Sequence, residues 1–212
     1  MSGHRPVSPS RVAGSTPLEV DVEYPNWFAQ SAQYNFEPLL QRFAGQDGLH
    51  FLQLGAYTGD ASVWMLENIL TDPESRLTDV DTWQGSNELA HEEMDFDEVY
   101  KIYEDKTKKF ISNLQIVRMS TFDWLINPVA RIPSYDFIYV DADHTTVGVL
   151  LDAELSWPLL KSGGIMAFDD YTWGDHYPMH QRPKPGIDLF LLRHSGEYDV
   201  LAVNLQYWIR KH

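Results

Sequence analysis

The stretch from residue 135 to residue 171, YDFIYVDADHTTVGVLLDAELSWPLLKSGGIMAFDDY, decides the fold class. Residues 135–141 form an almost continuously apolar run, as expected of a parallel strand covered on both faces. A crossover helix is predicted next, from apolar residues that recur every four positions: Val147, Leu151 and Leu155. Thr145 or Thr146 is its expected cap. Gly163 and Gly164 are expected to end the helical region before a second strand over residues 164–170.

The same alternation of short apolar runs and helical patterns extends along the chain and is typical of an α/β domain. We expect further strands over residues 50–54, 75–81, 114–119, 198–204 and 206–210. Helices are expected over residues 27–43, from near Asp60, over 88–110, after Ser120 and over 187–193. The predicted fold is therefore a Rossmann-like, seven-stranded, mostly parallel sheet with helices on both faces and a C-terminal antiparallel hairpin.

Length and composition limit the organisation and the chemistry. With 212 residues and 43% hydrophobic content, the chain can bury one sizeable core, so we expect a single domain over residues 24–212. Residues 1–23 are rich in Ser, Pro, Gly and Arg and are predicted to be a flexible tail. The chain has no cysteine, which excludes thiol chemistry and fits a cytoplasmic location.

The charge balance argues against two classes of partner. Acidic residues outnumber Lys and Arg by 31 to 16, which gives a formal net charge of -15. Such a field repels phosphate backbones and anionic membranes. No apolar run approaches the roughly 20 residues that span a bilayer. We therefore expect neither a nucleic-acid nor a membrane partner.

Polar residues follow each of the five predicted parallel strands, at the sheet edge where such folds bind ligands. After the first strand comes the turn GAYTGD, residues 55–60. The other strand ends carry Asp81, Thr82 and Trp83; Ser120 and Thr121; Asp141, Asp143 and His144; and Asp169 and Asp170. A purely structural sheet would not require polar groups at all five ends.

The glycine turn and Asp81 together favour a nucleoside-containing cofactor. Asp81 lies 22 residues past Gly59, where an acid typically binds ribose hydroxyls. The dinucleotide pattern G-x-G-x-x-G is not met, because Tyr57 stands where its second glycine would be and would crowd a pyrophosphate. A nicotinamide-dependent dehydrogenase is therefore disfavoured, and a nucleoside without phosphates, such as S-adenosylmethionine, is favoured.

Asp141, Asp169 and Asp170 supply three carboxylates from two neighbouring strand ends. Without a cation these charges would repel one another and raise their own pKa values. Mg²⁺ prefers such hard oxygen ligands and keeps positions open for water or substrate. The alternative is that some of these acids cap helices or pair with surface Lys and Arg, but the full set favours a metal.

Three stretches carry a family resemblance: FLQLGAYTGDASVWMLENIL (51–70), LTDVDTWQGS (77–86) and the stretch 135–171. On these, the chain from Tyr24 onward resembles class I S-adenosylmethionine-dependent methyltransferases, and among them the macrocin and sugar O-methyltransferase group. The resemblance implies cofactor contacts from Gln53, Gly55, Ala56, Tyr57, Gly59, Ser62, Asp81, Thr82, Trp83, Ser120 and Asp141. It also implies Mg²⁺ at Asp141, Asp169 and Asp170. Gln53 departs from the family, which usually has Glu or Asp there.

The catalytic residues implied by the resemblance are His144, as general base, and Asp141. Metal binding to an acceptor hydroxyl would lower its pKa, and an imidazole can take the proton. Asp143 is ambiguous: it orients His144, caps the next helix or faces solvent, and capping or solvent is preferred. His176 and His180 are four residues apart, as in some metal pairs, but their Pro-rich surroundings argue against a regular helix and so against a metal pair. These surroundings favour a loop over residues 171–186 that acts as a lid or as a wall of the acceptor site.

The function predicted from the sequence is thus magnesium-dependent O-methylation of a small-molecule or sugar acceptor. Two alternatives stay open, a metal-independent methyltransferase and a methyltransferase-like binding module without catalysis. The N-terminal helix and aromatic-rich edges could support a homo-oligomer. The identity of the acceptor is not encoded in any pattern of the sequence.

Overall fold

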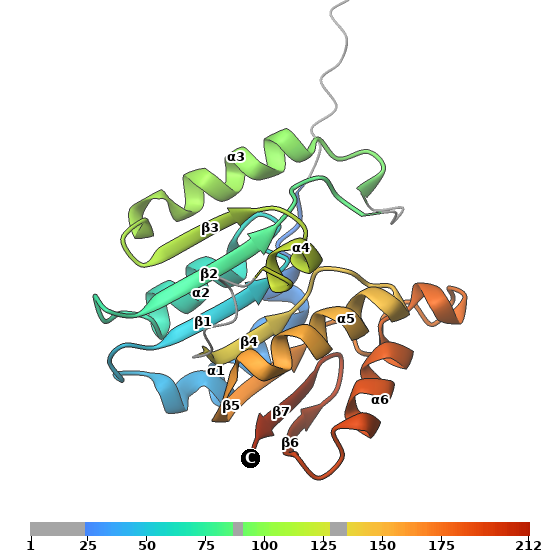
Figure 1. The fold of residues 1–212 in the computed structure, drawn as a ribbon. Coiled ribbons are helices and arrows are strands. Elements are labelled where there is room, and N and C mark those ends of the chain that lie inside the picture. The colour runs from blue at the N-terminus through green and yellow to red at the C-terminus, as the bar shows by residue number, and fades with distance from the viewer. Residues whose placement is uncertain (1–23, 87–90, 128–134) are drawn as a thin grey trace, which may run out of the picture.

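A seven-stranded sheet in the order β3-β2-β1-β4-β5-β7-β6 organises the molecule (Figure 1). The computed structural model describes residues 24–86, 91–127 and 135–212, so the tail expected at residues 1–23 lies outside the described residues. Strands β1 to β5 are parallel, and β7 is antiparallel to both β5 and β6. The strands are β1 His50–Leu54, β2 Arg76–Asp81, β3 Leu114–Arg118, β4 Tyr135–Val140, β5 Leu160–Phe168, β6 Tyr198–Val203 and β7 Tyr207–Lys211. This order confirms the predicted fold class.

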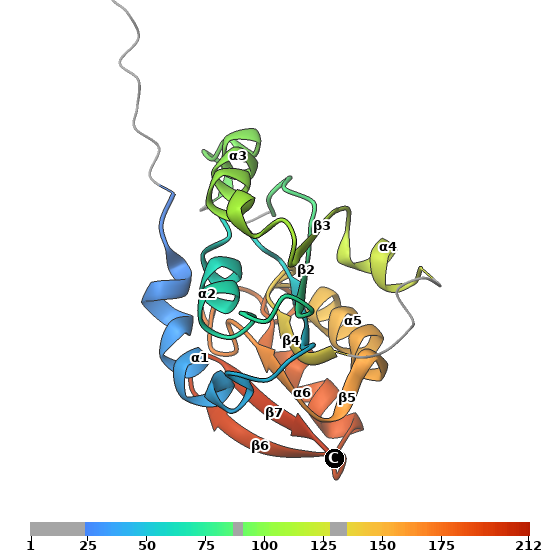
Figure 2. The same ribbon diagram turned by 90° about the vertical axis from the view of Figure 1, so that its left-hand side faces the viewer.

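Helices cover both faces of the sheet, with α1, α2 and α3 on one side and α4, α5 and α6 on the other (Figure 2). They are α1 Gln33–Leu40, α2 Asp60–Asn68, α3 Phe96–Thr107, α4 Thr121–Leu125, α5 Thr146–Ser156 and α6 Lys184–Arg193. The helix expected over 27–43 consists of α1 with a π-helical turn before it and a 3₁₀ turn after it. None of the described helices is long and apolar enough to cross a membrane.

The alternation of side chains along the strands divides the interior into two apolar cores. Phe51, Phe137 and Ala167 belong to the core under α1, α2 and α3. Leu52, Ile138 and Met166, their neighbours in sequence, belong to the core under α4, α5 and α6. Both faces of the parallel strands are therefore buried, which accounts for the near-continuous apolar runs in the sequence.

The helix expected over residues 88–110 begins later than predicted. Asp95 has an extended backbone, and its carboxylate accepts the N–H groups of Asp97 and Glu98, so it is the N-cap of α3. Residues 91–95 are not α-helical, and residues 87–90 lie outside the described residues. Val99 and Tyr103, on the inner face of α3, are fully buried.

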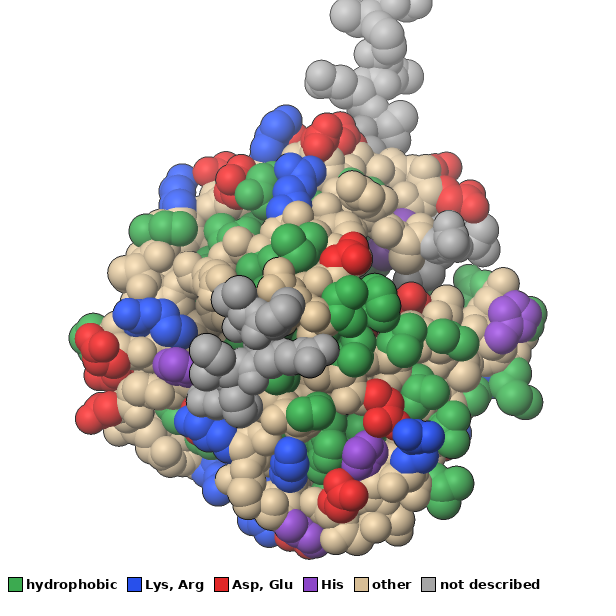
Figure 3. Space-filling model, in the orientation of Figure 1, with side chains coloured by type: hydrophobic (Ala, Val, Ile, Leu, Met, Phe, Trp, Pro, Cys, Tyr) green, Lys and Arg blue, Asp and Glu red, His purple; other side chains and the backbone are tan. Residues whose placement is uncertain are grey.

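Two of the three apolar residues from which α5 was predicted are exposed. Val147 is 63% exposed and Leu151 is 40% exposed, whereas Val149 and Ala153 are buried. Apolar residues occur around the whole circumference of α5, so their period alone could not select the face. The exposed pair adds to the apolar area over α4 and α5 (Figure 3). Thr145 is confirmed as the cap, since its hydroxyl accepts the N–H of Gly148 at 3.0 Å.

Gly163 and Gly164 do not end the helical region, contrary to expectation. Helix α5 ends at Ser156, a 3₁₀ turn covers Trp157–Leu159, and β5 already begins at Leu160. The two glycines lie inside β5 where its register with β4 shifts, between the pairs Tyr135↔Leu160 and Phe137↔Ile165. Glycine suits such a bulge because Gly163 adopts φ 79°.

Candidate functional site

The turn after β1 is packed tightly against the end of β4. Gly55 has φ 87° and donates its N–H to the carbonyl of Val80 at 2.9 Å. A Cβ built on Gly55 would lie 2.0 Å from the carbonyl oxygen of Asp141. Gly59, with φ 81°, ends the turn as the residue before α2. Only glycine at position 55 therefore lets the turn and the acidic strand end approach each other.

Asp81, the expected ribose ligand, also holds the glycine turn. Its Oδ2 accepts the backbone N–H groups of Ala56 at 2.7 Å and Tyr57 at 3.0 Å, and its Oδ1 accepts that of Trp83 at 2.7 Å. The indole of Trp83 donates back to the carbonyl of Tyr57 at 2.9 Å. The ends of β1 and β2 are thus joined by one carboxylate and one indole, which fixes the shape of the turn.

Gln53 and Ser62 lie behind the turn and are almost completely buried. Gln53 donates from Nε2 to the carbonyl of Gly55 at 2.8 Å and accepts from the Ser62 hydroxyl at 3.2 Å. A carboxylate at position 53 has no N–H and could not make the first of these bonds. The glutamine therefore has a structural use in this chain, as a donor to the turn.

A hollow of about 450 Å³ opens next to Asp81, at the ends of β2 and β3. It is lined by Thr82, Gln84, Arg118, Met119, Ser120 and Asp123. Ser120 caps α4 by accepting the N–H of Asp123 at 3.0 Å, so its position at the rim is fixed by the helix start. Two of the residues expected at the cofactor, Thr82 and Ser120, thus line one cavity.

Backbone strain gathers at the same edge. Among the described residues, the non-glycine residues with positive φ are Tyr57 (46°), Trp83 (48°) and Asp170 (53°). They follow β1, β2 and β5 respectively, all at the carboxyl ends of the strands. Each such residue costs about 1–2 kcal/mol, and such residues cluster at functional sites. The strain marks this edge independently of the polar residues.

Asp141, His144 and Asp170 converge at the ends of β4 and β5. Each offers one ligand atom, and these atoms lie within 4.8 Å of one another. The Nε2 of His144 is 3.0 Å from Asp170 Oδ2 and 3.6 Å from Asp141 Oδ1. The three side chains are partly exposed, at 27% for Asp141, 19% for His144 and 28% for Asp170. This geometry brings together donors that suit a cation.

Asp169, the third expected ligand, has a different orientation. Its Oδ2 accepts the hydroxyl proton of Tyr139, and its Oδ1 accepts the N–H of Asp170 at 3.0 Å. Burial raises the pKa of Asp141 well above its ordinary range. The charge of Asp169 raises this pKa further, whereas the hydrogen bond with His144 lowers it. A nearby cation would favour the charged form of this carboxyl group and so lower its pKa.

Asp143 lies two residues before Thr145, the N-cap of α5. Its Oδ1 accepts the N–H of Thr145 at 2.7 Å. A Cβ built on Gly148 would lie 2.0 Å from Asp143 Cγ, so the side chain is laid along the first turn of the helix and fills the space over the glycine. Asp143 is thus exposed to solvent and supports the residue that caps α5, rather than being the cap itself.

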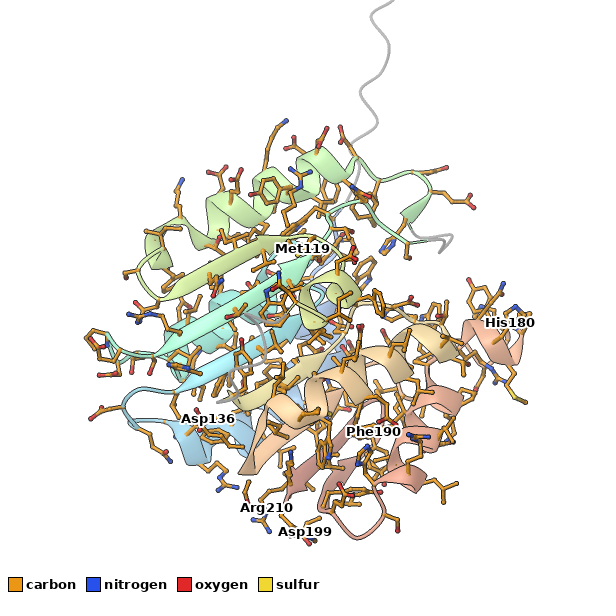
Figure 4. All side chains as sticks on the ribbon, in the orientation of Figure 1. Met119, Asp136, His180, Phe190, Asp199 and Arg210 are labelled. Carbon is orange, nitrogen blue, oxygen red and sulfur yellow. The ribbon has the colours of Figure 1, made fainter. Side chains whose placement is uncertain are left out.

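The segment after β5 covers the histidine of the cluster. Trp173 lies against His144, with ring centroids 5.2 Å apart, and stacks on Tyr177 at 5.2 Å. His176 and His180 are exposed and belong to no metal-ligating group within the described ranges. Figure 4 shows His180 at the periphery, away from Met119 at the end of β3. The aromatic part of this segment, rather than its histidines, therefore faces the site.

Comparison with protein families identifies the chain. A family model described as "Methyltransferase domain" matches residues 52–171. The chain belongs to this methyltransferase family. The matched range runs from β1 to the residue after Asp170, so it contains the glycine turn, Asp81 and the acidic cluster. Membership implies S-adenosylmethionine as the methyl donor. A search of curated protein sequences finds no match.

Solved structures share the fold of this methyltransferase at low sequence identity. A "putative rRNA-methylase" from Clostridium thermocellum is 13% identical with a TM-score of 0.60, over 90% of this chain and 100% of the other. An O-methyltransferase from Bacillus cereus, in complex with SAH, is 15% identical with a TM-score of 0.55, over 76% and 74%. A "putative caffeoyl-CoA O-methyltransferase" from Staphylococcus aureus is 15% identical with a TM-score of 0.54, over 77% and 76%.

The sequence did not reveal an aromatic stack over the glycine turn of the methyltransferase. Trp27, which precedes α1, stacks on Tyr57 with ring centroids 4.6 Å apart. His91 is parallel to the Tyr57 ring at 6.4 Å, and the Tyr57 hydroxyl reaches Met94 Sδ at 3.6 Å. These residues lie far apart in the sequence, so no sequence pattern predicts that they meet. The one indication was the bulky side chain of Tyr57 between two glycines.

Two buried acids of the methyltransferase were also missed. Asp79 in β2 is fully buried, accepts from the Tyr103 hydroxyl at 2.7 Å, and burial raises its pKa from 3.8 to about 7. Asp152 in α5 is 2% exposed, accepts from the Thr121 hydroxyl at 2.6 Å, and burial likewise raises its pKa to about 7. Each has another acid two residues further along the sequence, Asp81 and Glu154 respectively, so nothing in the sequence distinguishes it from a surface acid.

These acids predict that the stability of the methyltransferase falls between about pH 4 and about pH 7. In this window the folded chain keeps protons on Asp79 and Asp152 that the unfolded chain has released above pH 4, so rising pH favours unfolding. We expect roughly 2–4 kcal/mol per acid. Denaturant unfolding at several pH values should show a shallower slope for Asp79→Asn. Asp105→Asn, at an exposed position on α3, should keep the wild-type slope, and a flat wild-type profile would contradict the assignment.

Proposed function

We propose that the protein is a magnesium-dependent O-methyltransferase that methylates a hydroxyl of a small molecule or sugar, as in the macrocin and sugar O-methyltransferase group. The observation that carries this proposal is the convergence of Asp141, His144 and Asp170 beside the glycine turn. The folds of the Bacillus cereus and Staphylococcus aureus proteins, both named O-methyltransferases, support it. The rRNA-methylase name of another neighbour is outweighed by the net charge of -15.

The cofactor would lie along the ends of β1, β2 and β3. Asp81 would accept the ribose hydroxyls with the lone pairs that its three backbone contacts leave open. The adenine would occupy the hollow between Thr82 and Ser120. The turn from Gly55 to Gly59 would hold the methionine portion, with Gln53 and Ser62 supporting it from behind. This arrangement would direct the sulfonium methyl group towards the ends of β4 and β5.

The acidic cluster fits a divalent cation by its chemistry. Asp141 and Asp170 supply carboxylate oxygens on one side of a partly exposed site, and Asp169 contributes charge and could contribute Oδ1. Burial raises the pKa of Asp141 well above its ordinary range and the charges of Asp169 and Asp170 add to this, so a cation bound there would relieve the repulsion among these acids. Mg²⁺ bound there would lower the pKa of an acceptor hydroxyl.

His144 is placed to take the proton from the acceptor. Methyl transfer is a displacement at the sulfonium carbon, so the acceptor oxygen must lie in line with it and be at least partly deprotonated. The Nε2 of His144 lies close to a carboxylate oxygen of both Asp141 and Asp170, which would stabilise the imidazolium. Trp173 covers one side of this ring and would exclude water, so the 171–186 segment is proposed as the acceptor wall.

Removing the metal tests this proposal. We expect the protein to methylate at least one of a panel of sugars and phenols when supplied with labelled S-adenosylmethionine and Mg²⁺. EDTA should lower the rate on the order of 10²-fold, and added Mg²⁺ should restore it. An unchanged rate in EDTA would point to a metal-independent methyltransferase. If calorimetry shows no binding of S-adenosylmethionine, the chain is a binding module without this activity.

A further inference from the structure

A row of buried polar side chains leads from the N-terminal helix to the acidic cluster. It consists of Asn35 in α1, Gln206 between β6 and β7, and Tyr139 in β4, which are 5%, 0% and 1% exposed. All three lie in or beside the apolar core under α1, α2 and α3, where an unsatisfied polar group would be costly. Such a row is stable in the core only if its members satisfy one another's hydrogen-bonding groups.

The hydrogen bonds of this row fix the direction of every donor. Gln206 Oε1 accepts from Asn35 Nδ2 at 2.7 Å and from the Trp208 indole at 2.9 Å. Its amide nitrogen therefore faces the other way and donates to the Tyr139 hydroxyl at 3.4 Å. Since the hydroxyl oxygen accepts this bond, the single hydroxyl proton is left for Asp169 Oδ2.

The Asn35 side chain, at the other end of the row from Asp169, is held in place as well. Its amide exchanges two bonds with the amide of Asn204, each 3.0 Å long. The backbone N–H of Gln206 also donates to Asn204 Oδ1 at 2.9 Å. The turn between β6 and β7 and the helix α1 are thereby joined into one rigid support for Tyr139.

We propose that Tyr139 is a positioning residue of the metal site, which turns the Asp169 carboxylate through a hydrogen bond held in place by Gln206 and Asn35. With Oδ2 bound to Tyr139, only Oδ1 of Asp169 is directed along the backbone towards Asp170. Tyr139 thus decides how Asp169 joins Asp141 and Asp170 around a cation. This inference rests on the proposed metal-dependent function and adds a role for α1 in it.

Metal affinity, measured without substrate, tests the proposal. Free Mn²⁺ can be counted by electron paramagnetic resonance during titration, and Mg²⁺ can then be added as a competitor. We expect Tyr139→Phe to bind Mn²⁺ about 10-fold or more weakly than the wild type, because residues that orient ligands typically contribute 10- to 100-fold. Binding of S-adenosylhomocysteine, measured by calorimetry without metal, should be unchanged.

Tyr135→Phe is the matched control, since it removes the same atom from the other end of the same strand. Its Mn²⁺ affinity should equal that of the wild type. Asn35→Ala provides a second variant, remote from the acids, and should weaken Mn²⁺ binding in the same direction by a smaller factor. It remains informative if Tyr139→Phe does not fold.

The outcomes separate the two proposals. If the wild type binds no Mn²⁺, the metal-dependent function is wrong and the positioning role falls with it. If the wild type binds Mn²⁺ and both Tyr139→Phe and Asn35→Ala bind it equally well, the positioning role alone is overturned. Weaker binding by both variants, with the control unchanged, supports it.

Discussion

Replacing Gly55 with alanine is expected to destabilise the protein by about 3 kcal/mol or more and to abolish binding of S-adenosylmethionine. The new Cβ would lie 2.0 Å from the carbonyl oxygen of Asp141 and 2.9 Å from the Cα of Ala142. Both are backbone atoms, so no side-chain rotation can relieve the overlap. Either the glycine turn or the end of β4 must move, and each carries residues of the proposed site.

Gly163→Ala is the matched control for the effect of backbone conformation. Gly163 has φ 79°, close to the 87° of Gly55, but a Cβ built there meets no atom within 4 Å. It should therefore show only the left-handed penalty of about 1–2 kcal/mol, with normal cofactor binding. Denaturant unfolding and calorimetry measure the two quantities. Equal losses in Gly55→Ala and Gly163→Ala would show that the close approach to Asp141 is unimportant.

Replacing His144 with alanine is expected to lower kcat by about 10²- to 10⁴-fold, the usual contribution of a general base. The affinity for S-adenosylmethionine should be unchanged, because His144 lies at the end of β4, away from the hollow beside Asp81. The pH–rate profile of the variant should also lack the step caused by deprotonation of the base. Its rate should instead increase in proportion to the hydroxide concentration. Initial rates over a range of pH at saturating Mg²⁺ measure this.

The same variant separates two roles that the geometry allows for His144. Its Nε2 lies within the group of atoms that could hold a cation. If His144 is a ligand rather than the base, His144→Ala should weaken Mn²⁺ binding at least as much as Asp170→Asn. If it is the base, Mn²⁺ binding should persist while kcat falls. His50→Ala is the control, since His50 is an exposed histidine at the start of β1, at the opposite edge of the sheet from the site, and should match the wild type.

The position of Asp81 would link the proposed cofactor binding to local stability. One carboxylate accepts three backbone N–H groups from the turns after β1 and β2. Two of the strained residues, Tyr57 and Trp83, are held by these bonds. The shape of the proposed cofactor pocket is therefore set without a ligand, which would lower the ordering cost of binding.

Much of the architecture could be predicted from local sequence. Strand β4 was recognisable because a parallel strand buried on both faces must be apolar along its length, and Asp141 and His144 stood out because they interrupt that run. Since all parallel strands end at one edge, Gly55, Asp81 and Asp170 could be placed together without knowledge of their contacts. The period of α5 predicted a helix, but apolar residues on all sides concealed which face is buried.

The sequence by itself therefore determined the order of the elements, the edge that carries the site and the residue types available there. Only the tertiary structure decided how those residues are used: Asp169 turned towards Tyr139, Asp143 laid along α5, and Trp27 stacked over Tyr57. The reason is physical. The type of each element follows from the periodicity of neighbouring residues. The direction of a side chain depends instead on its tertiary partners. Asn35 and Gln206, for example, lie 171 positions apart and meet only when α1 packs against the sheet.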